Sequence, residues 1–205
     1  MSFFDIYGAK LVKAVLTHLE YVLIAVSVGF VIALFLGIAL SRMRRGAKYI
    51  LPVLSVFQTI PGIVFIGILF LYLGMIPATA IIALTVYAIF PVLKNTYAGI
   101  LNVAPQYIEA ARGCGMSGIQ RLIRVELPLA MPTIIGGLRM SAVYTTSWAV
   151  ISAMIGLGGL GDFIYIGVNT NNNTLILAGA VPSAIIAVCF GIGLDRLQKR
   201  LTPRS

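Results

Sequence analysis

The chain has 205 residues, of which 60% are hydrophobic and 10% are charged, and its mean hydropathy is +1.01. A soluble domain carries about 25% charged residues, so this composition excludes an ordinary soluble protein and predicts an all-α integral membrane protein. The net charge of +9 does not indicate nucleic-acid binding, because the basic residues flank apolar segments and form no patch interleaved with exposed aromatic residues.

Apolar runs of roughly 20 residues, the length that crosses about 30 Å of hydrocarbon as a helix, recur along the chain. They predict a single domain over residues 1–205 with about five transmembrane helices: Tyr21–Leu40, Ile50–Gly74, Met75–Leu93, Leu129–Ile151 and Leu175–Leu194. Glycines within these runs, such as Gly37 and Gly137, are expected to let neighbouring helices pack closely.

Basic residues decide the expected orientation. They gather in residues 41–49, 94–127 and 195–205, which all lie on one side of five spans. The positive-inside rule then places the N-terminus outside and the C-terminus in the cytoplasm, as a multi-pass protein of the cell membrane. A hairpin over Leu129–Val168 would add a sixth span and carry the basic tail outside. The other alternative is that residues 156–174 dip into or pack on the outer surface without crossing.

The sequence contains no phosphate-binding loop, no paired carboxylates inside the spans and no Cys/His cluster. We therefore expect that the chain is not an enzyme, with no catalytic residue, no metal site and no bound cofactor. The lack of ionisable pairs at bilayer depth also argues against a carrier driven by protons or sodium ions. A sodium site built from backbone carbonyls would escape this argument and keeps the carrier as an alternative.

One long polar stretch, EAARGCGMSGIQRLIRVELP at residues 109–128, interrupts the apolar sequence. Pro105 and the alanines predict a short helix that ends before Gly115. Ser117 is expected to cap a second helix, which Pro128 is expected to end. Basic residues beside leucine and isoleucine would also suit an amphipathic helix on lipid headgroups, so composition alone leaves both functions open.

The spacing within this stretch resembles the EAA loop of binding-protein-dependent ABC importer permeases. The family pattern is Glu-Ala-Ala, three residues, Gly, nine residues, an aliphatic residue, any residue and Leu-Pro. The residues in register are Glu109, Ala110, Ala111, Gly115, Leu127 and Pro128, with Val125 where isoleucine is more frequent. The segments IPGIVFIGILF and GLGGLGDFIY also look like this class, so the resemblance covers nearly the whole chain.

The resemblance implies a cytoplasmic coupling loop over about residues 94–128. In this class two permease subunits, identical or paralogous, form the pathway, and an extracytoplasmic binding protein delivers the substrate. Two cytoplasmic ATPase subunits dock on the EAA loops and hydrolyse the ATP. Movement of the short helix at residues 107–112 would then drive alternating access. The implied coupling residues are Tyr107, Glu109, Ala110, Ala111, Arg112, Gly115, Met116, Leu127 and Pro128.

Within this class, QTIPG at residues 58–62 and RMSAVYTTSWAVISAMIGLGGLGDFI look most similar to permeases for quaternary-ammonium osmoprotectants: glycine betaine, carnitine and choline. Methionine permeases share the size and the outer glycine-rich segment, and they are the alternative. An aromatic cage for such a cation is expected on the binding protein, and a weakly polar pathway is expected in the permease. The candidate pathway residues are Gln58, Thr59, Pro61, Arg139, Ser141, Thr145 and Thr146.

Arg139 is the only charged residue inside a predicted span. It lies roughly 16 Å along the helix axis from Pro128, near mid-membrane. An arginine there costs about 2.5–3.5 kcal/mol on insertion scales, so we expect it to face protein or water. Two roles are open: a gate that changes partners, or a structural group satisfied by backbone carbonyls near Gly136 and Gly137 or by the C-terminal end of a neighbouring helix.

Overall fold

The computed structural model describes residues 3–202, except for the side chains of Phe4, Arg44, Met154 and Ile155. Within this range the chain is helical and contains no strand, which confirms the all-α prediction. The elements are α1 Phe3–Arg42, α2 Arg44–Phe57, α3 Gly62–Leu73, α4 Pro77–Leu101, α5 Pro105–Gly113, α6 Gly118–Arg121, the π-helix η1 Leu122–Glu126, α7 Leu127–Ser152, the π-helix η2 Ala153–Leu157, α8 Leu160–Asn169 and α9 Asn173–Leu201.

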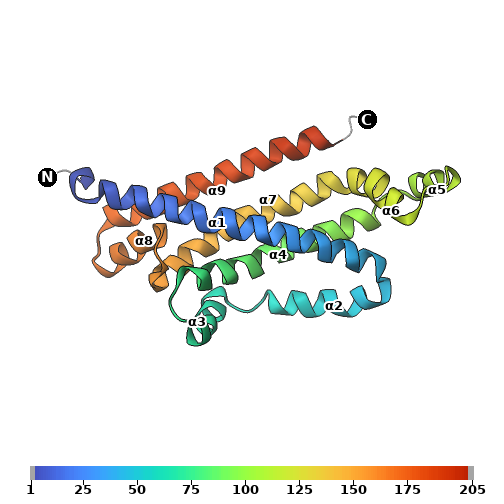
Figure 1. Cartoon of the computed structure of the whole chain (residues 1–205). Coiled ribbons are helices and arrows are strands. Elements are labelled where there is room, and N and C mark those ends of the chain that lie inside the picture. Colours follow the sequence, from blue (N-terminus) through green and yellow to red (C-terminus); the bar gives the residue numbers. More distant parts are fainter. Residues whose placement is uncertain (1–2, 203–205) are drawn as a thin grey trace.

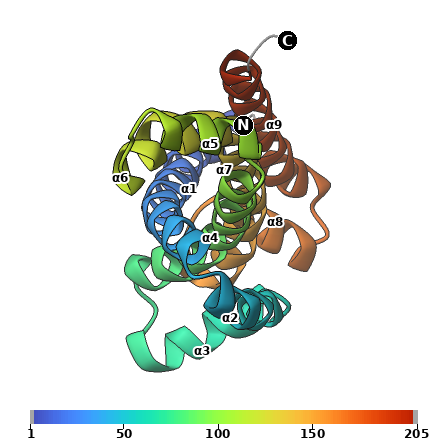
Figure 2. The same ribbon diagram turned by 90° about the vertical axis from the view of Figure 1, so that its right-hand side faces the viewer.

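The centre of the bundle is formed by α1, α4 and α7, with α9 packed along α7 (Figures 1 and 2). Both faces of α4 meet a glycine of the neighbouring helix. A Cβ on Gly37 of α1 would lie 2.7 Å from the Cβ of Thr96, and a Cβ on Gly137 of α7 would lie 2.6 Å from the Cβ of Asn95. Because lipid is as apolar as leucine, close approach of backbones stabilises these contacts better than burial of large side chains would.

The second predicted span is broken. α2 and α3 are bent by 88° at the break, and together they are long and apolar enough for one membrane span. The predicted span over Ile50–Gly74 is therefore present as two helices that meet at a sharp bend, and not as one continuous helix. Pro61 gives the physical reason, since a proline disfavours the helical conformation in the residue before it and offers no N–H for a helical hydrogen bond.

Three further helices are long and apolar enough to cross a membrane by themselves: residues Asp5–Arg42 of α1, then α4 and α9. α7 has 26 residues and hence the length to cross, but its sequence, which includes Arg139, is less apolar. α1 has 40 residues, or about 60 Å, and starts well before the predicted span at Tyr21. The predicted loop at residues 41–49 is mostly helical, because α2 already begins at Arg44.

The two ends of the bundle differ. Figure 1 shows α5 and α6 at one end, near the end of α1 and the start of α2, while the N-terminal end of α1 and α8 lie at the other. α8 has 10 residues, about 15 Å, which is too short to cross the membrane. The structure therefore agrees with a segment at residues 156–174 that does not cross, because α8 is too short to supply the sixth span of the hairpin alternative.

Candidate functional site

The short helix α5 begins with Pro105, whose missing N–H is not needed in the first helical turn. Two hydrogen bonds close its other end. The N–H of Gly115 donates to the carbonyl of Arg112 at 2.9 Å, and the N–H of Met116 donates to the carbonyl of Ala111 at 3.1 Å. This is a Schellman cap, which needs left-handed backbone at one residue, and Gly115 supplies it with φ of +74°. The motif glycine thus serves the backbone of the turn.

The second helix starts at a capping box. The hydroxyl of Ser117 accepts the N–H of Gln120 at 3.3 Å, and the side-chain oxygen of Gln120 accepts the N–H of Ser117 at 2.9 Å. The predicted cap is confirmed. The prediction that Pro128 ends this helix is wrong, because α6 continues through η1 into α7 with Pro128 in its first turn. The wider π-helical turn before Pro128 accommodates the interruption that a proline causes.

The loop presents apolar side chains to its surroundings. Tyr107 is 49% exposed, Ile119 71% and Ile123 59%. Of the two motif alanines, Ala110 is exposed, whereas Ala111 is buried against the rest of the chain. Among the other implied coupling residues, Glu109, Arg112, Gly115 and Pro128 are exposed, and Met116 and Leu127 are half-buried.

A hollow of about 420 Å³ lies beneath α5, where it faces the ends of α1 and α4. Glu109 and Arg112 line it from α5, Arg121 and Glu126 line it from α6 and η1, and Arg42 lines it from the end of α1. Apolar residues of α4 and α5 also line it. The inner side of α5 thus combines a buried alanine with a hollow that has both charged and apolar lining residues.

Glu126 links the C-terminal end of the coupling loop to α1 through ion pairs. Its side chain is 3% exposed, its Oε1 accepts hydrogen bonds from Arg42 Nη1 at 3.3 Å and Arg121 Nε at 2.9 Å, and its Oε2 pairs with Arg42 Nη2. Burial raises the pKa of this carboxyl, but the hydrogen bonds and charges of both arginines outweigh burial and hold the pKa below its ordinary value. The carboxylate therefore joins the end of α1 to the segment that leads into α7.

The predicted pathway residues occupy separate places. Gln58 and Thr59 lie at the break between α2 and α3, next to the exposed Pro61. Gln58 and Thr59 line a hollow of about 390 Å³ that Ser55, Tyr87, Tyr144 and Trp148 complete. The structure thus brings part of α2 together with α4 and α7 at this hollow.

The three predicted hydroxyl residues of α7 lie inside the bundle instead. Ser141, Thr145 and Thr146 are each at most 1% exposed. The hydroxyl of Ser141 donates to the carbonyl of Ala88 on α4 at 2.8 Å, and that of Thr146 donates to the carbonyl of Ala142 at 2.8 Å. Their part in a pathway stays a prediction.

Arg139 reaches across to α9. Its Nη1 lies 2.7 Å from Oδ1 of Asp195, and Lys199 Nζ lies 2.7 Å from Oδ2 of the same carboxylate. Of the two structural alternatives, the partner of Arg139 therefore lies near the C-terminal end of a neighbouring helix, as a side-chain carboxylate, and not at backbone carbonyls near Gly136 and Gly137. The span prediction ended at Leu194 and left Asp195 outside, whereas α9 continues to Leu201.

Residues 25–205 match the family described as "Binding-protein-dependent transport system inner membrane component". The chain belongs to this family. The permease is 40% identical over 205 residues to the carnitine transport permease protein OpuCB of Listeria monocytogenes, covering 100% of this chain and 94% of that protein. It is 38% identical, with the same coverage, to the glycine betaine/carnitine/choline transport system permease protein OpuCB of Bacillus subtilis.

Solved structures share the fold of the permease. An inward-facing MetNI methionine ABC transporter, in its CY5 native crystal form, superposes with a TM-score of 0.84 at 24% identity, covering 99% of this chain and 100% of that chain. An amino acid ABC transporter crystallised with histidines superposes with a TM-score of 0.70 at 21% identity, covering 98% and 97%. The fold is therefore shared with transporters of different solutes.

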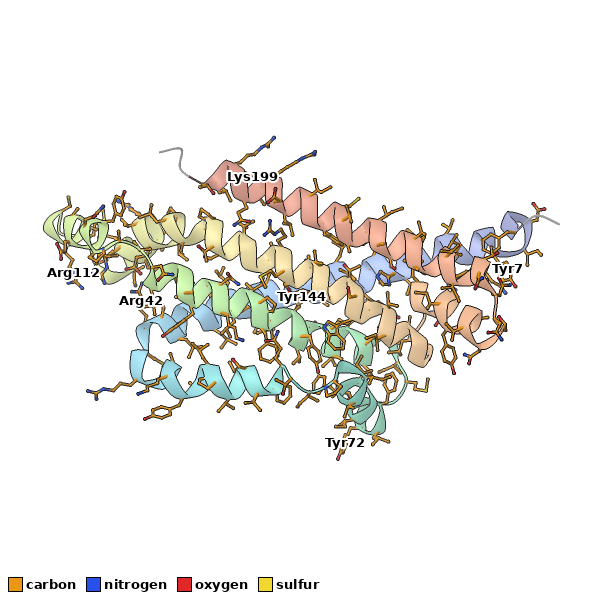
Figure 3. The ribbon with its side chains drawn as sticks, turned by 180° about the vertical axis from the view of Figure 1, so that it is seen from behind. Tyr7, Arg42, Tyr72, Arg112, Tyr144 and Lys199 are labelled. Atoms are coloured by element: carbon orange, nitrogen blue, oxygen red, sulfur yellow. The ribbon has the colours of Figure 1, made fainter. Side chains whose placement is uncertain are left out.

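Two features of the permease were not singled out from its sequence. Glu126 lies four residues after Leu122, so it falls on the apolar face of its helix, and a carboxylate in that place is a signal for a buried ion pair. Tyr144 and Trp148 are four residues apart on α7 and so share a helix face, but no local pattern connects them to Tyr87 on α4. Figure 3 shows Tyr144 near the middle of the long axis, well away from Arg112 at one end and Tyr7 at the other.

Proposed function

We propose that this permease is the membrane-spanning subunit of an ATP-driven importer for a quaternary-ammonium osmoprotectant such as glycine betaine, carnitine or choline. The support for the substrate class is that relatives named for these solutes match nearly the whole chain. They include the choline transport system permease protein OpuBB of Bacillus subtilis, 37% identical over 99% of this chain and 94% of that protein. The permease conducts the solute, and its partners hydrolyse the ATP.

The observation that carries the proposal is the capped helix pair α5–α6 at the basic end of the bundle. Its turn is closed by a Schellman cap and a capping box, it exposes Tyr107 and Ile119, and a hollow with charged and apolar lining residues lies beneath it. A cytoplasmic ATPase subunit docks on this outer face, so the basic end lies in the cytoplasm and the N-terminus outside. A second permease copy or paralogue and an extracytoplasmic binding protein complete the importer.

Coupling then follows from the attachments of the loop. When ATP closes the two ATPase subunits, α5 moves with the groove that holds it. The movement reaches α7 through the continuous α6–η1–α7 helix and reaches α1 through the Glu126 ion pairs. Two packings of the helices, inward-open and outward-open, are the two states that nucleotide biases.

The test is uptake by the importer reconstituted in liposomes with its ATPase and binding protein. A panel of glycine betaine, carnitine, choline and methionine separates the substrate classes. We expect uptake of at least one quaternary-ammonium solute that requires both ATP and the binding protein. Uptake of methionine and of none of the other three solutes would show that the protein belongs to the alternative class, the methionine permeases. Uptake that follows a sodium or proton gradient without ATP would contradict the importer proposal.

A further inference from the structure

The hollow at the break between α2 and α3 has the composition of a site for a small organic cation. Its volume of about 390 Å³ falls in the range of small-molecule sites, about 300–1,000 Å³. Three of its six lining residues, Tyr87, Tyr144 and Trp148, are aromatic, and none is acidic. A quaternary ammonium carries no N–H to donate, so the face of an aromatic ring suits it better than a hydrogen-bond acceptor does.

The aromatic wall is held in place by its surroundings. Tyr87 and Trp148 stack with ring centroids 5.0 Å apart and planes 21° apart, and the hydroxyl of Tyr87 donates to the carbonyl of Ile60 at 2.8 Å. A Cβ on Gly62 would overlap the indole ring of Trp148, so only glycine leaves room for the ring there. These contacts orient the rings before any solute arrives, which lowers the entropic cost of binding.

The other three lining residues of the hollow, Ser55, Gln58 and Thr59, are polar, and Lys94 lies behind Gln58. The side-chain oxygen of Gln58 accepts a hydrogen bond from Lys94 Nζ at 3.4 Å, and this is its one side-chain hydrogen bond among the described residues. With its oxygen turned to Lys94, the amide presents its N–H₂ group as a donor. A carboxylate fits beside this donor and the lysine charge, whereas a second cationic group does not.

We propose that this hollow is a transient substrate site inside the permease for zwitterionic quaternary-ammonium solutes. The ring faces of Tyr144 and Trp148 contact the trimethylammonium group, and Gln58, oriented by Lys94, faces the carboxylate. The site rests on the proposed function and adds to it a preference for glycine betaine and carnitine over choline, which lacks the carboxylate. Tyr144 is 47% exposed, so part of its side chain is accessible to a solute.

The single tryptophan of the chain offers a direct measurement, because Trp148 is the only source of indole fluorescence. The permease in lipid vesicles is titrated with glycine betaine and with tert-butylacetate, in which carbon replaces the ammonium nitrogen. We expect a saturable fluorescence change with glycine betaine and none with tert-butylacetate at equal concentration. Choline should need about fivefold higher concentration. Equal responses to glycine betaine and tert-butylacetate would overturn the proposal.

Variants assign the response to residues. Tyr144→Leu removes one ring face and should raise the half-saturating concentration about fivefold, while Tyr144→Phe keeps the ring and should match the parent. Gln58→Leu should abolish the preference for glycine betaine over choline. Tyr165→Leu on α8 is the matched control, since Tyr165 is 48% exposed but lies outside the hollow, and it should leave the titration unchanged.

Uptake by the reconstituted importer separates failure of the site from failure of the proposed function. An importer that carries glycine betaine equally well with Tyr144→Leu and with Gln58→Leu would refute the site and leave the proposed function standing. An importer that carries no quaternary-ammonium solute, together with a flat Trp148 titration, would refute both. If Tyr144→Leu does not assemble, the titration of the unaltered chain decides.

Discussion

Arg139 on α7 and Asp195 on α9 form an ion pair, with Nη1 and Oδ1 2.7 Å apart. Asp195 also pairs with Lys199 one helical turn further along α9. One carboxylate is therefore shared by two cations that approach it from different helices. This arrangement joins the two helices and gives the charged Arg139 a partner within the protein, as a residue at that depth of a predicted span requires.

The first prediction is an order of severity among variants of this cluster. Asp195→Asn should lower the melting temperature of the assembled complex more than Arg139→Leu, because it leaves Arg139 and Lys199 without a counter-charge, whereas Arg139→Leu leaves Asp195 paired with Lys199. Lys199→Gln, at a side chain 76% exposed, is the control and should change little. A larger loss of stability in Arg139→Leu than in Asp195→Asn would contradict this prediction. A loss of transport per complex without loss of stability would favour a role of Arg139 as a gate.

The second prediction concerns the backbone of the EAA turn. No atom lies within 4 Å of a Cβ built on Gly115, so a side chain there meets open space, and the only obstacle is φ of +74°. Gly115→Ala should therefore impair coupling of ATP hydrolysis to uptake almost as much as Gly115→Leu, at a cost of about 1–2 kcal/mol for left-handed backbone. Gly115→Asn should be milder, because asparagine tolerates this conformation.

Gly113→Ala provides the control for this prediction. Gly113 also has open space around its Cβ position, but its backbone is helical, so alanine should be neutral or slightly stabilising. The measurement is the ratio of ATP hydrolysed to solute imported. A normal ratio in Gly115→Leu would mean that the match to the EAA motif is accidental.

The third prediction is that Glu126→Gln loosens the loop. The neutral amide cannot balance Arg42 and Arg121 at a site where the carboxylate is 3% exposed, so stability should fall by about 1–3 kcal/mol. Proteolysis within the loop should also become faster. Glu109→Gln, at an exposed carboxylate of the same loop, should have little effect on either. Equal protease resistance of Glu126→Gln and the parent would show that the ion pairs do not hold the loop.

The same carboxylate predicts a dependence on pH. Its pKa in the folded chain is lower than the ordinary value of 4.5, so its contribution to stability is complete above pH 4.5. The contribution is lost as the pH falls from 4.5 through the lowered pKa. The difference in melting temperature between the parent and Glu126→Gln should therefore be constant near neutral pH and shrink only in this acidic range. A difference that shrinks between pH 8 and pH 6 would point to another group.

The fourth prediction tests the orientation with a residue already in the turn. Cys114 is exposed, and its side chain takes part in neither cap of the turn. A label on Ser117 would break the capping box, because its hydroxyl and N–H form that box. With Cys189 replaced by serine, a membrane-impermeant maleimide should label Cys114 in inside-out vesicles and leave it unlabelled in intact cells. Bound ATPase should slow the labelling. Labelling from the outside would invert the topology.

Features that depend on residues near one another in sequence were predicted well. The helix after Pro105, the turn at Gly115 and the cap at Ser117 depend on hydrogen bonds between residues three to five apart, so local chemistry determines them. The apolar runs likewise determined a helical membrane protein, because an uninterrupted helix satisfies its own backbone groups in lipid. Local reasoning went wrong at Pro128, because a π-helical turn upstream altered the effect of the proline.

The tertiary structure decided which distant side chains meet. Arg42 and Glu126 are 84 residues apart and Arg139 and Asp195 are 56 apart, so neither ion pair follows from spacing along the chain. The 88° bend between α2 and α3 brings Gln58 to the rings of Tyr87 and Trp148. A run of apolar residues determines that a segment is buried in lipid or protein. It does not determine which neighbouring helix the segment faces. That choice is made by helix crossings at small residues such as Gly137, where a single methyl group would clash.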